Sequence, residues 1–177
     1  MRARAVTDGI TDPRWRTRAL AELAVTAASR GDHAAASRFA EEAEAVCSTI
    51  AFTARKAMAL TEIVTAVAVT GGLTRAEALA RSIAVPHWRA RATAELVSIV
   101  AGDARKARVL ADTICEPDLR ARAQVAIAAR STASEARALI TSTLRTGEWI
   151  ATLDVLARIE PAVVLAIGND FLCTPRD

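Results

Sequence analysis

The chain has 177 residues, of which 52% are apolar, 3% are aromatic and 24% are charged, and its formal net charge is +3. Its 42 Ala and 21 Arg, against 2 Lys and no Tyr, favour helices over a β-sandwich or barrel, because strands draw on aromatic and β-branched residues. High apolar content with a small net charge also excludes intrinsic disorder. We therefore expect one all-α domain that spans residues 1–177.

The predicted helices begin and end at capping and turn residues. Asp12 before Pro13 indicates an N-cap with proline at the first helical position, and Gly31-Asp32 indicates the end of one helix and the cap of the next. Taken in chain order, the expected helices span residues 13–30, 33–46, 49–70, 74–84, 86–101, 103–114, 117–130, 133–145, 147–159 and 161–170.

Capping boxes and prolines mark the later boundaries. Thr74 with Glu77 and Thr132 with Glu135 have the spacing in which each side chain caps the other residue's backbone N–H. A residue before proline avoids helical geometry, so Pro86 separates two units. The ten helices then pair as five antiparallel hairpins, at about residues 13–46, 49–84, 86–114, 117–145 and 147–170.

The hairpins repeat one sequence pattern. An Arg-X-Arg-Ala run opens the first helix of three units, as in Trp88-Arg89-Ala90-Arg91-Ala92, and Ala residues four apart recur in the second helices of the first three units. The equivalent positions Leu23, Ile63, Leu96 and Ile127 are separated by 40, 33 and 31 residues. A single amphipathic hairpin cannot bury its apolar stripe, so we expect the units to stack side by side as an α-solenoid.

The spacing of apolar and small residues resembles the tetratricopeptide repeat (TPR). The first unit carries it on Leu20, Leu23, Ala24, Ala27, Ala36, Ala40 and Ala43, and the second on Leu60, Ile63, Val64, Val67, Ala76, Ala80 and Ile83. This resemblance implies a right-handed superhelix whose first helices line a concave face. A HEAT-like repeat is the alternative, because Ala27, Val67 and Val100 replace the aromatic residue of the TPR signature.

On such a concave face, two rows of side chains become candidates for partner binding. One row holds Arg18, Met58, Arg91 and Arg122, and the row one helical turn later holds Glu22, Glu62 and Glu95. Arg and Glu four residues apart also stabilise a solvated helix by a few tenths of a kcal/mol, so Arg18–Glu22 and Arg91–Glu95 have a simpler interpretation as mutual pairs. Arg122 has Ala126 at that position and is the most available for an external anion.

The sequence predicts no catalytic residue, no metal site and no cofactor. His33 and His87 are expected on the surface, and no partner for a general base lies at helical spacing from either of them. The acidic cluster Glu41, Glu42 and Glu44 has no following histidine, so a solvated face is expected there. We expect a protein that is not an enzyme.

Cysteines and tryptophans suggest packing instead of chemistry. Cys47, Cys115 and Cys173 are too far apart for a close-spaced zinc site, and we interpret them as reduced, mostly buried thiols of a cytoplasmic protein. Trp15, Trp88 and Trp149 each stand near the start of a first helix, and Leu119 fills the matching place in the fourth unit. Replacement by Leu favours packing between repeats over a ligand cage.

The expected function is therefore that of a non-catalytic scaffold that binds a protein or peptide segment. Nucleic acid is a disfavoured alternative, because basic and acidic side chains are interleaved along both halves of the chain. Self-association through the C-terminal hairpin, at the apolar run 162–167, is a further alternative. No signal peptide and no membrane-spanning segment are expected.

Overall fold

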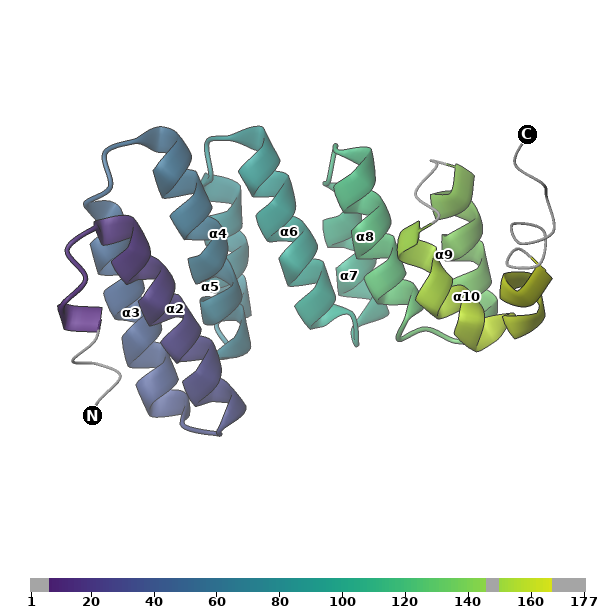
Figure 1. Ribbon diagram of the computed structural model, residues 1–177, viewed down its shortest axis with the longest axis horizontal. Coiled ribbons are helices and arrows are strands. Elements are labelled where there is room, and N and C mark those ends of the chain that lie inside the picture. Colours follow the sequence, from purple (N-terminus) through teal and green to yellow (C-terminus); the bar gives the residue numbers. More distant parts are fainter. Residues whose placement is uncertain (1–6, 146–149, 167–177) are drawn as a thin grey trace, which may run out of the picture. The chain divides into compact units, whose positions relative to one another are not determined.

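The computed structural model describes residues 7–145 and 150–166. Every regular element in these residues is helical, which confirms the all-α class (Figure 1). In chain order the elements are α2 (Pro13–Ser29), α3 (His33–Ser48), α4 (Thr53–Val69), α5 (Leu73–Ser82), α6 (Pro86–Val100), α7 (Ala104–Asp112), α8 (Pro117–Ala128), α9 (Ala133–Arg145), the 3-10 turn η1 (Ile150–Thr152) and α10 (Leu153–Ile159).

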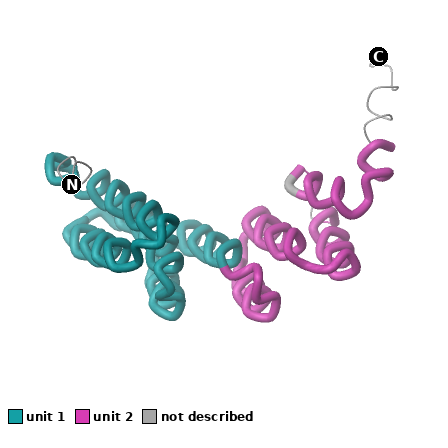
Figure 2. The backbone as a smooth tube through the Cα atoms, turned by 90° about the horizontal axis from the view of Figure 1, so that it is seen from below, with its two compact units in different colours: residues 1–99 teal, residues 100–177 magenta. Residues whose placement is uncertain are grey.

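The chain divides into two compact units, Met1–Ile99 and Val100–Asp177 (Figure 2). In the first unit, α2 pairs with α3 and α4 pairs with α5, while α2 also packs directly on α4. The hydroxyl of Thr61 on α4 donates to the carbonyl of Trp88 on α6, at 3.3 Å. The first helices α2, α4 and α6 therefore follow one another across this unit, with α3 and α5 behind them (Figure 1).

Small side chains lie where the paired helices meet. The alanines that the sequence spaces four apart are all buried, with exposed fractions of 3% or less. Because alanine lets two helix backbones approach closely, this spacing fixes which faces meet. The residues concerned are Ala36 and Ala40 on α3, Ala76 and Ala80 on α5, and Ala107 and Ala111 on α7.

Glycine and aspartate shape the turns of the first unit. Gly31 has φ +79° and Gly71 has φ +90°, a left-handed conformation that glycine adopts without the strain of a Cβ. The carboxylate of Asp12 accepts from the backbone N–H of Arg14 at 2.8 Å, and that of Asp32 accepts from Ala35 at 2.9 Å. Both aspartates are thus the N-caps that the sequence indicated.

Two predicted boundaries of the first unit are wrong. The helix expected from residue 49 begins at Thr53, because Thr49 instead ends α3, where its hydroxyl donates to the carbonyl of Val46 at 2.7 Å. The short connection buries Ile50 and leaves Phe52 at the start of α4. Thr74 is no cap either, since α5 already begins at Leu73 and its N-cap residue is Gly72.

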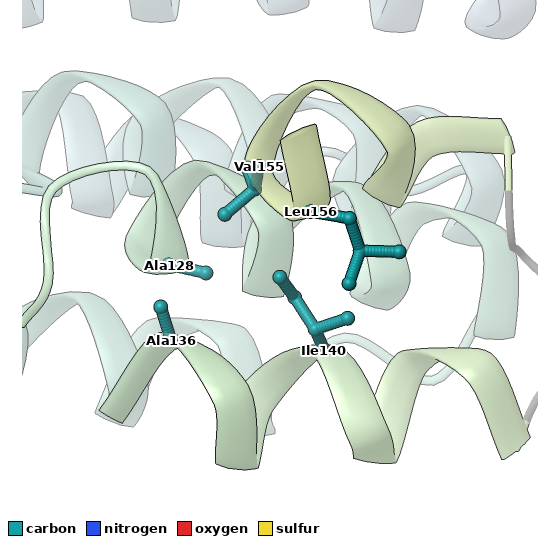
Figure 3. Close-up of a cluster of buried hydrophobic side chains, with 5 residues drawn as sticks. All are labelled: Ala128, Ala136, Ile140, Val155 and Leu156. Atoms are coloured by element: carbon teal, nitrogen blue, oxygen red, sulfur yellow. The ribbon is translucent and has the colours of Figure 1, made fainter. Parts of the chain in front are cut away.

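The second unit has its own apolar core. Ala128 of α8, Ala136 and Ile140 of α9, and Val155 and Leu156 of α10 form one buried cluster (Figure 3). The capping box of α9 is present, because the Thr132 N–H donates to the Glu135 carboxylate at 3.3 Å and the Glu135 N–H donates to the Thr132 hydroxyl at 3.4 Å. The helix expected over 147–159 is divided into η1 and α10, and residues 146–149 and 167–170 lie outside the described residues.

A buried isoleucine and an arginine mark each of two equivalent junctions between hairpins. In the first unit, Arg89 donates to the carbonyl of Ile83 at 3.4 Å; in the second, Arg120 donates to the carbonyl of Ile114 at 2.7 Å. Both isoleucines are at most 1% exposed. In these two Arg-X-Arg runs the first arginine therefore binds the preceding turn, and the second arginine is exposed.

Candidate functional site

Three successive first helices of the first unit surround one hollow of about 270 Å³. Five of the predicted partner-binding residues line it, and they come from all three helices. They are Arg18 of α2, Met58 and Glu62 of α4, and Arg91 and Glu95 of α6. The sequence register of the repeat thus brings side chains that are far apart along the chain to one place.

The two arginines of this register have different surroundings. The Arg18 guanidinium pairs with the Glu22 carboxylate at 3.0 Å, as predicted from their spacing. The equivalent pair on α6 is not formed: within the part of the chain that the structure describes, Arg91 makes no ion pair, and its guanidinium lies 5.5 Å from the centre of the Trp88 ring. Arg91 is exposed and therefore available to an external anion.

Arg14 is a lining residue that the sequence reasoning missed. It stands one turn before Arg18 on α2, and its guanidinium lies 4.6 Å from the centre of the Trp15 ring. The signal was available, since Arg14, Arg18 and Glu22 follow one another at a spacing of four residues. The hollow consequently contains three guanidinium groups, from Arg14, Arg18 and Arg91.

The tryptophans do not all pack as expected. Trp15 is 48% exposed, so it is not buried between repeats, whereas Trp88 is half-buried and lines the hollow. Leu119, which occupies the matching position on α8, is buried. The matching position therefore does not keep one packing role along the chain. Trp149 lies outside the described residues.

Glu62 is a half-buried acid among the three arginines. Its partial burial raises its pKa above the ordinary value, and the positive charges of Arg18, Arg14 and Arg91 oppose this rise without cancelling it. Among the described residues, no hydrogen-bond or ion-pair partner reaches the Glu62 carboxylate. The three arginines therefore act on the charge of Glu62 through space instead of by contact. In the described residues, no salt bridge between Glu62 and an arginine stands in the way of a ligand.

A second hollow of about 350 Å³ adjoins the first along α2 and α4. It shares Arg18 and Glu62 with the first hollow, and it continues toward the C-terminal end of α2 along Ala21, Val25 and Thr26. Glu22, the remaining predicted residue of this unit, lies here. The surface therefore becomes less polar toward the C-terminal end of α2, where Ala21 and Val25 join the charged side chains.

Arg122 belongs to the second unit. It is exposed on α8, and no ion pair joins it to another described residue. Ala126, four residues later, supplies no carboxylate, as the sequence indicated. The structure thus places six of the seven predicted residues on α2, α4 and α6, and the seventh on a helix of the other unit.

The acidic cluster of α3 is partly paired, which corrects the prediction of a simply solvated face. Glu42 accepts from Arg16 of α2 at 3.2 Å, and Glu44 accepts from Arg75 of α5 at 2.9 Å. These bonds tie α3 to both neighbouring helices. No cluster of three metal-ligating side chains occurs among residues 7–145 and 150–166.

The structure describes both histidines and the cysteines Cys47 and Cys115, whereas Cys173 lies outside the described residues. His33 and His87 are both exposed, as expected. Cys47 is buried, and its burial raises the pKa of the thiol to about 11, so it is a poor nucleophile. Cys115 is exposed, contrary to the expectation of a buried thiol, because it lies in the turn between α7 and α8.

The surface near the C-terminal end includes Val163, which is 44% exposed, and Leu165, which is 68% exposed. Self-association at this run stays a prediction. Over the residues that were described, no helix combines the length and the apolar character that crossing a membrane requires.

The chain has no significant match among models of known protein families, among curated proteins or among solved structures.

Proposed function

We propose that the protein is a non-catalytic binding module, a TPR-like α-solenoid of helical hairpins that holds a segment of a partner protein. The segment lies in the hollow between α2, α4 and α6. One observation carries the proposal: three successive first helices converge on this hollow with Arg14, Arg18 and Arg91, beside the half-buried ring of Trp88. Arginine and tryptophan are the side chains that most often anchor a protein interface.

The scaffold holds these side chains in place before a partner arrives. Leu20, Ile63 and Leu96 are at most 1% exposed, so each of the three helices that line the hollow is anchored by a fully buried side chain. A preorganised surface loses less conformational entropy on binding. The side chains above this core are free to contact a ligand, since neither Arg14 nor Arg91 forms an ion pair with another described residue.

The charges in the hollow favour a protein segment over nucleic acid. Glu62 and Glu95 line it together with the arginines, and Glu22 stands beside Arg18. A phosphate backbone presents evenly spaced negative charges and would meet these carboxylates at each step. A protein segment can instead carry a single charge at one position, and a lining of mixed charge can accommodate it.

Selection from a displayed library of short random peptides tests the proposal. We expect the full-length chain to enrich peptides that bind the Arg91→Glu variant at least about tenfold more weakly, a loss of about 1.4 kcal/mol. The matched control is Arg105→Glu, which reverses the charge of an exposed arginine in the first turn of α7. The proposal is wrong if no peptide is enriched, or if the enriched peptides bind both variants as well as they bind the parent.

A gel-shift titration with single-stranded RNA at low salt tests the alternative. Phosphate contacts strengthen as salt falls, so low salt is the most sensitive condition. We expect no shift. If the parent and Arg105→Glu shift the RNA and Arg91→Glu does not, the occupant of the hollow is nucleic acid and not a protein segment.

A further inference from the structure

The two adjoining hollows differ in chemistry, and this difference indicates the order of side chains in the partner segment. The first hollow, at the N-terminal half of α2, has Arg14, Arg18 and Arg91 in its lining. The second, at the C-terminal half of α2, has Ala21 and Val25. Because both include Arg18 and Glu62, one extended segment can pass from the first to the second.

The charged hollow is suited to a carboxylate. Arg14 and Arg91 come from α2 and α6 and are both without an ion-pair partner in the described structure, whereas Arg18 is already paired with Glu22. A guanidinium binds a carboxylate through two parallel hydrogen bonds, so two unpaired guanidinium groups form a strong site for one acidic side chain. A lysine or arginine of the partner would meet these three like charges, which the carboxylates of Glu62 and Glu95 offset only in part.

Glu62 sets a limit on how much negative charge the hollow accepts. Its carboxylate is half-buried and lies within the electrostatic range of Arg14, Arg18, Arg91 and Glu22. A second acidic side chain in the partner would therefore be repelled by Glu62 and find no further unpaired guanidinium in this lining. One acidic residue is favoured here, and a run of several is not.

The neighbouring hollow is suited to an apolar side chain. Val25 is half-buried, so an aliphatic or aromatic side chain that covers it removes further apolar surface from water, whereas Ala21 is already buried. The hydroxyl of Thr26 and the carboxylate of Glu22 border this area. The contact is small, so it contributes to selectivity more than to affinity.

We propose that the partner segment carries a single acidic side chain that binds Arg14 and Arg91, and an apolar side chain that covers Val25. This inference rests on the function proposed above and specifies the ligand of the same site. The acidic residue lies over the N-terminal half of α2 and the apolar residue over its C-terminal half.

A double-mutant cycle on an enriched peptide tests the acidic contact. Replacement of the peptide's acidic residue by its amide, or Arg91→Gln in the full-length protein, should each weaken binding about tenfold, as the loss of one charge-assisted bond predicts. Together they should cost clearly less than the sum of the two losses, because both changes remove the contact with Arg91 while the contact with Arg14 depends on the peptide's charge alone. Arg105→Gln is the control and should add no coupling.

Val25→Ser tests the apolar contact in the same peptides. We expect a loss of about threefold for peptides with the apolar residue and none for peptides in which alanine replaces it. Val109→Ser, at an exposed valine of α7, is the matched control.

The outcomes separate this inference from the proposed function. Enriched peptides that depend on Arg91 yet bind equally well as acid and amide would overturn the inference and leave the proposed function standing. Absence of any enriched peptide would overturn both. Additive losses in the cycle would also contradict the inference, because they show that the acidic residue and Arg91 do not touch.

Discussion

Equivalent sequence positions of the repeat carry different side chains in the hollow of the first unit and on the surface of α8 in the second unit. On α6, Arg91 lies over Trp88 and shares its hollow with Glu62 and Glu95. On α8, Arg122 is exposed, and the positions that match Trp88 and Glu95 hold the buried Leu119 and Ala126.

The comparison separates the buried positions of the repeat, which are alike in the two units, from the exposed positions, which differ. The buried positions of the repeat keep their role in both units, since Ile83 and Ile114, and Ile63 and Ile127, are all at most 1% exposed. The exposed positions change from one hairpin to the next, because stacking does not constrain them. On the proposed function, binding specificity would be a property of particular hairpins, whereas the buried positions are common to both units.

The largest expected effect tests whether the buried positions are equivalent in the two units. Ile63→Ala and Ile127→Ala should each reduce the free energy of unfolding by about 2–5 kcal/mol, because each leaves a cavity in a closed core. Urea unfolding followed by circular dichroism measures both. Val109→Ala, at a residue that is 62% exposed, is the control and should stay close to the parent. Unequal losses would show that one unit repacks and the other does not.

The next effect tests whether the exposed positions differ. Arg91→Glu should weaken an enriched peptide at least about tenfold, whereas Arg122→Glu should change its affinity by less than about twofold. Isothermal titration with the full-length chain measures both constants. An equal loss for Arg122→Glu would show that the segment also contacts α8, and the proposed site would then extend beyond the first unit.

A smaller effect concerns the arginines that bind the preceding turn. Arg120→Met should cost about 1 kcal/mol, because its hydrogen bond to the Ile114 carbonyl is short, at 2.7 Å. Arg89→Met should cost less, since its bond to the Ile83 carbonyl is 3.4 Å long. Thermal unfolding compares the two with Arg105→Met. The reverse order would mean that packing of the side-chain stem, and not the hydrogen bond, stabilises these junctions.

The smallest effects are opposite pH dependences of two glutamates. Partial burial raises the pKa of Glu62, so the folded state retains a proton that the unfolded state has lost, and stability falls as pH rises from 4.5 through the raised pKa. Hydrogen bonds from Thr132 lower the pKa of Glu135, so its contribution is present above 4.5 and is lost as pH falls through the lowered pKa.

Glutamine variants make this contrast measurable. Relative to the parent, Glu62→Gln should gain stability from mildly acidic to neutral pH, and Glu135→Gln should lose it over the acidic range as pH rises. Urea midpoints across that range measure both trends. If the stability of both variants relative to the parent changed in the same direction with pH, the proposed difference between Glu62 and Glu135 would be wrong.

Much of the helical pattern could be predicted because its signals are local. Asp12-Pro13 and Asp32 mark helix starts by their own hydrogen bonds, and alanines four apart mark the faces that meet. The start of α4 was missed because Thr49 and Phe52 carry no strong stop or start signal. Burial of Ile50 decides the course of the chain there, and burial depends on other helices.

The candidate site was predicted in part for a related reason. The repeat register identified Arg18, Glu62 and Arg91, because equivalent positions of stacked helices face the same side. Arg14 was missed, since it has no equivalent arginine in the other repeats. Whether Arg91 pairs with Glu95 or lies against Trp88 depends on side-chain rotamers and on the side chains of the neighbouring helix. The spacing of residues along one helix determines neither.

The sequence by itself therefore determined the all-α class, most helix boundaries, the buried alanines and the register of the arginines, because helix periodicity and capping act over a few residues. Only the tertiary structure decided which arginines pair, that Glu62 is half-buried among three guanidinium groups, and that two hollows join along α2. Those features arise where side chains from α2, α4 and α6 meet, and their energies depend on burial and on charges brought together from distant parts of the chain.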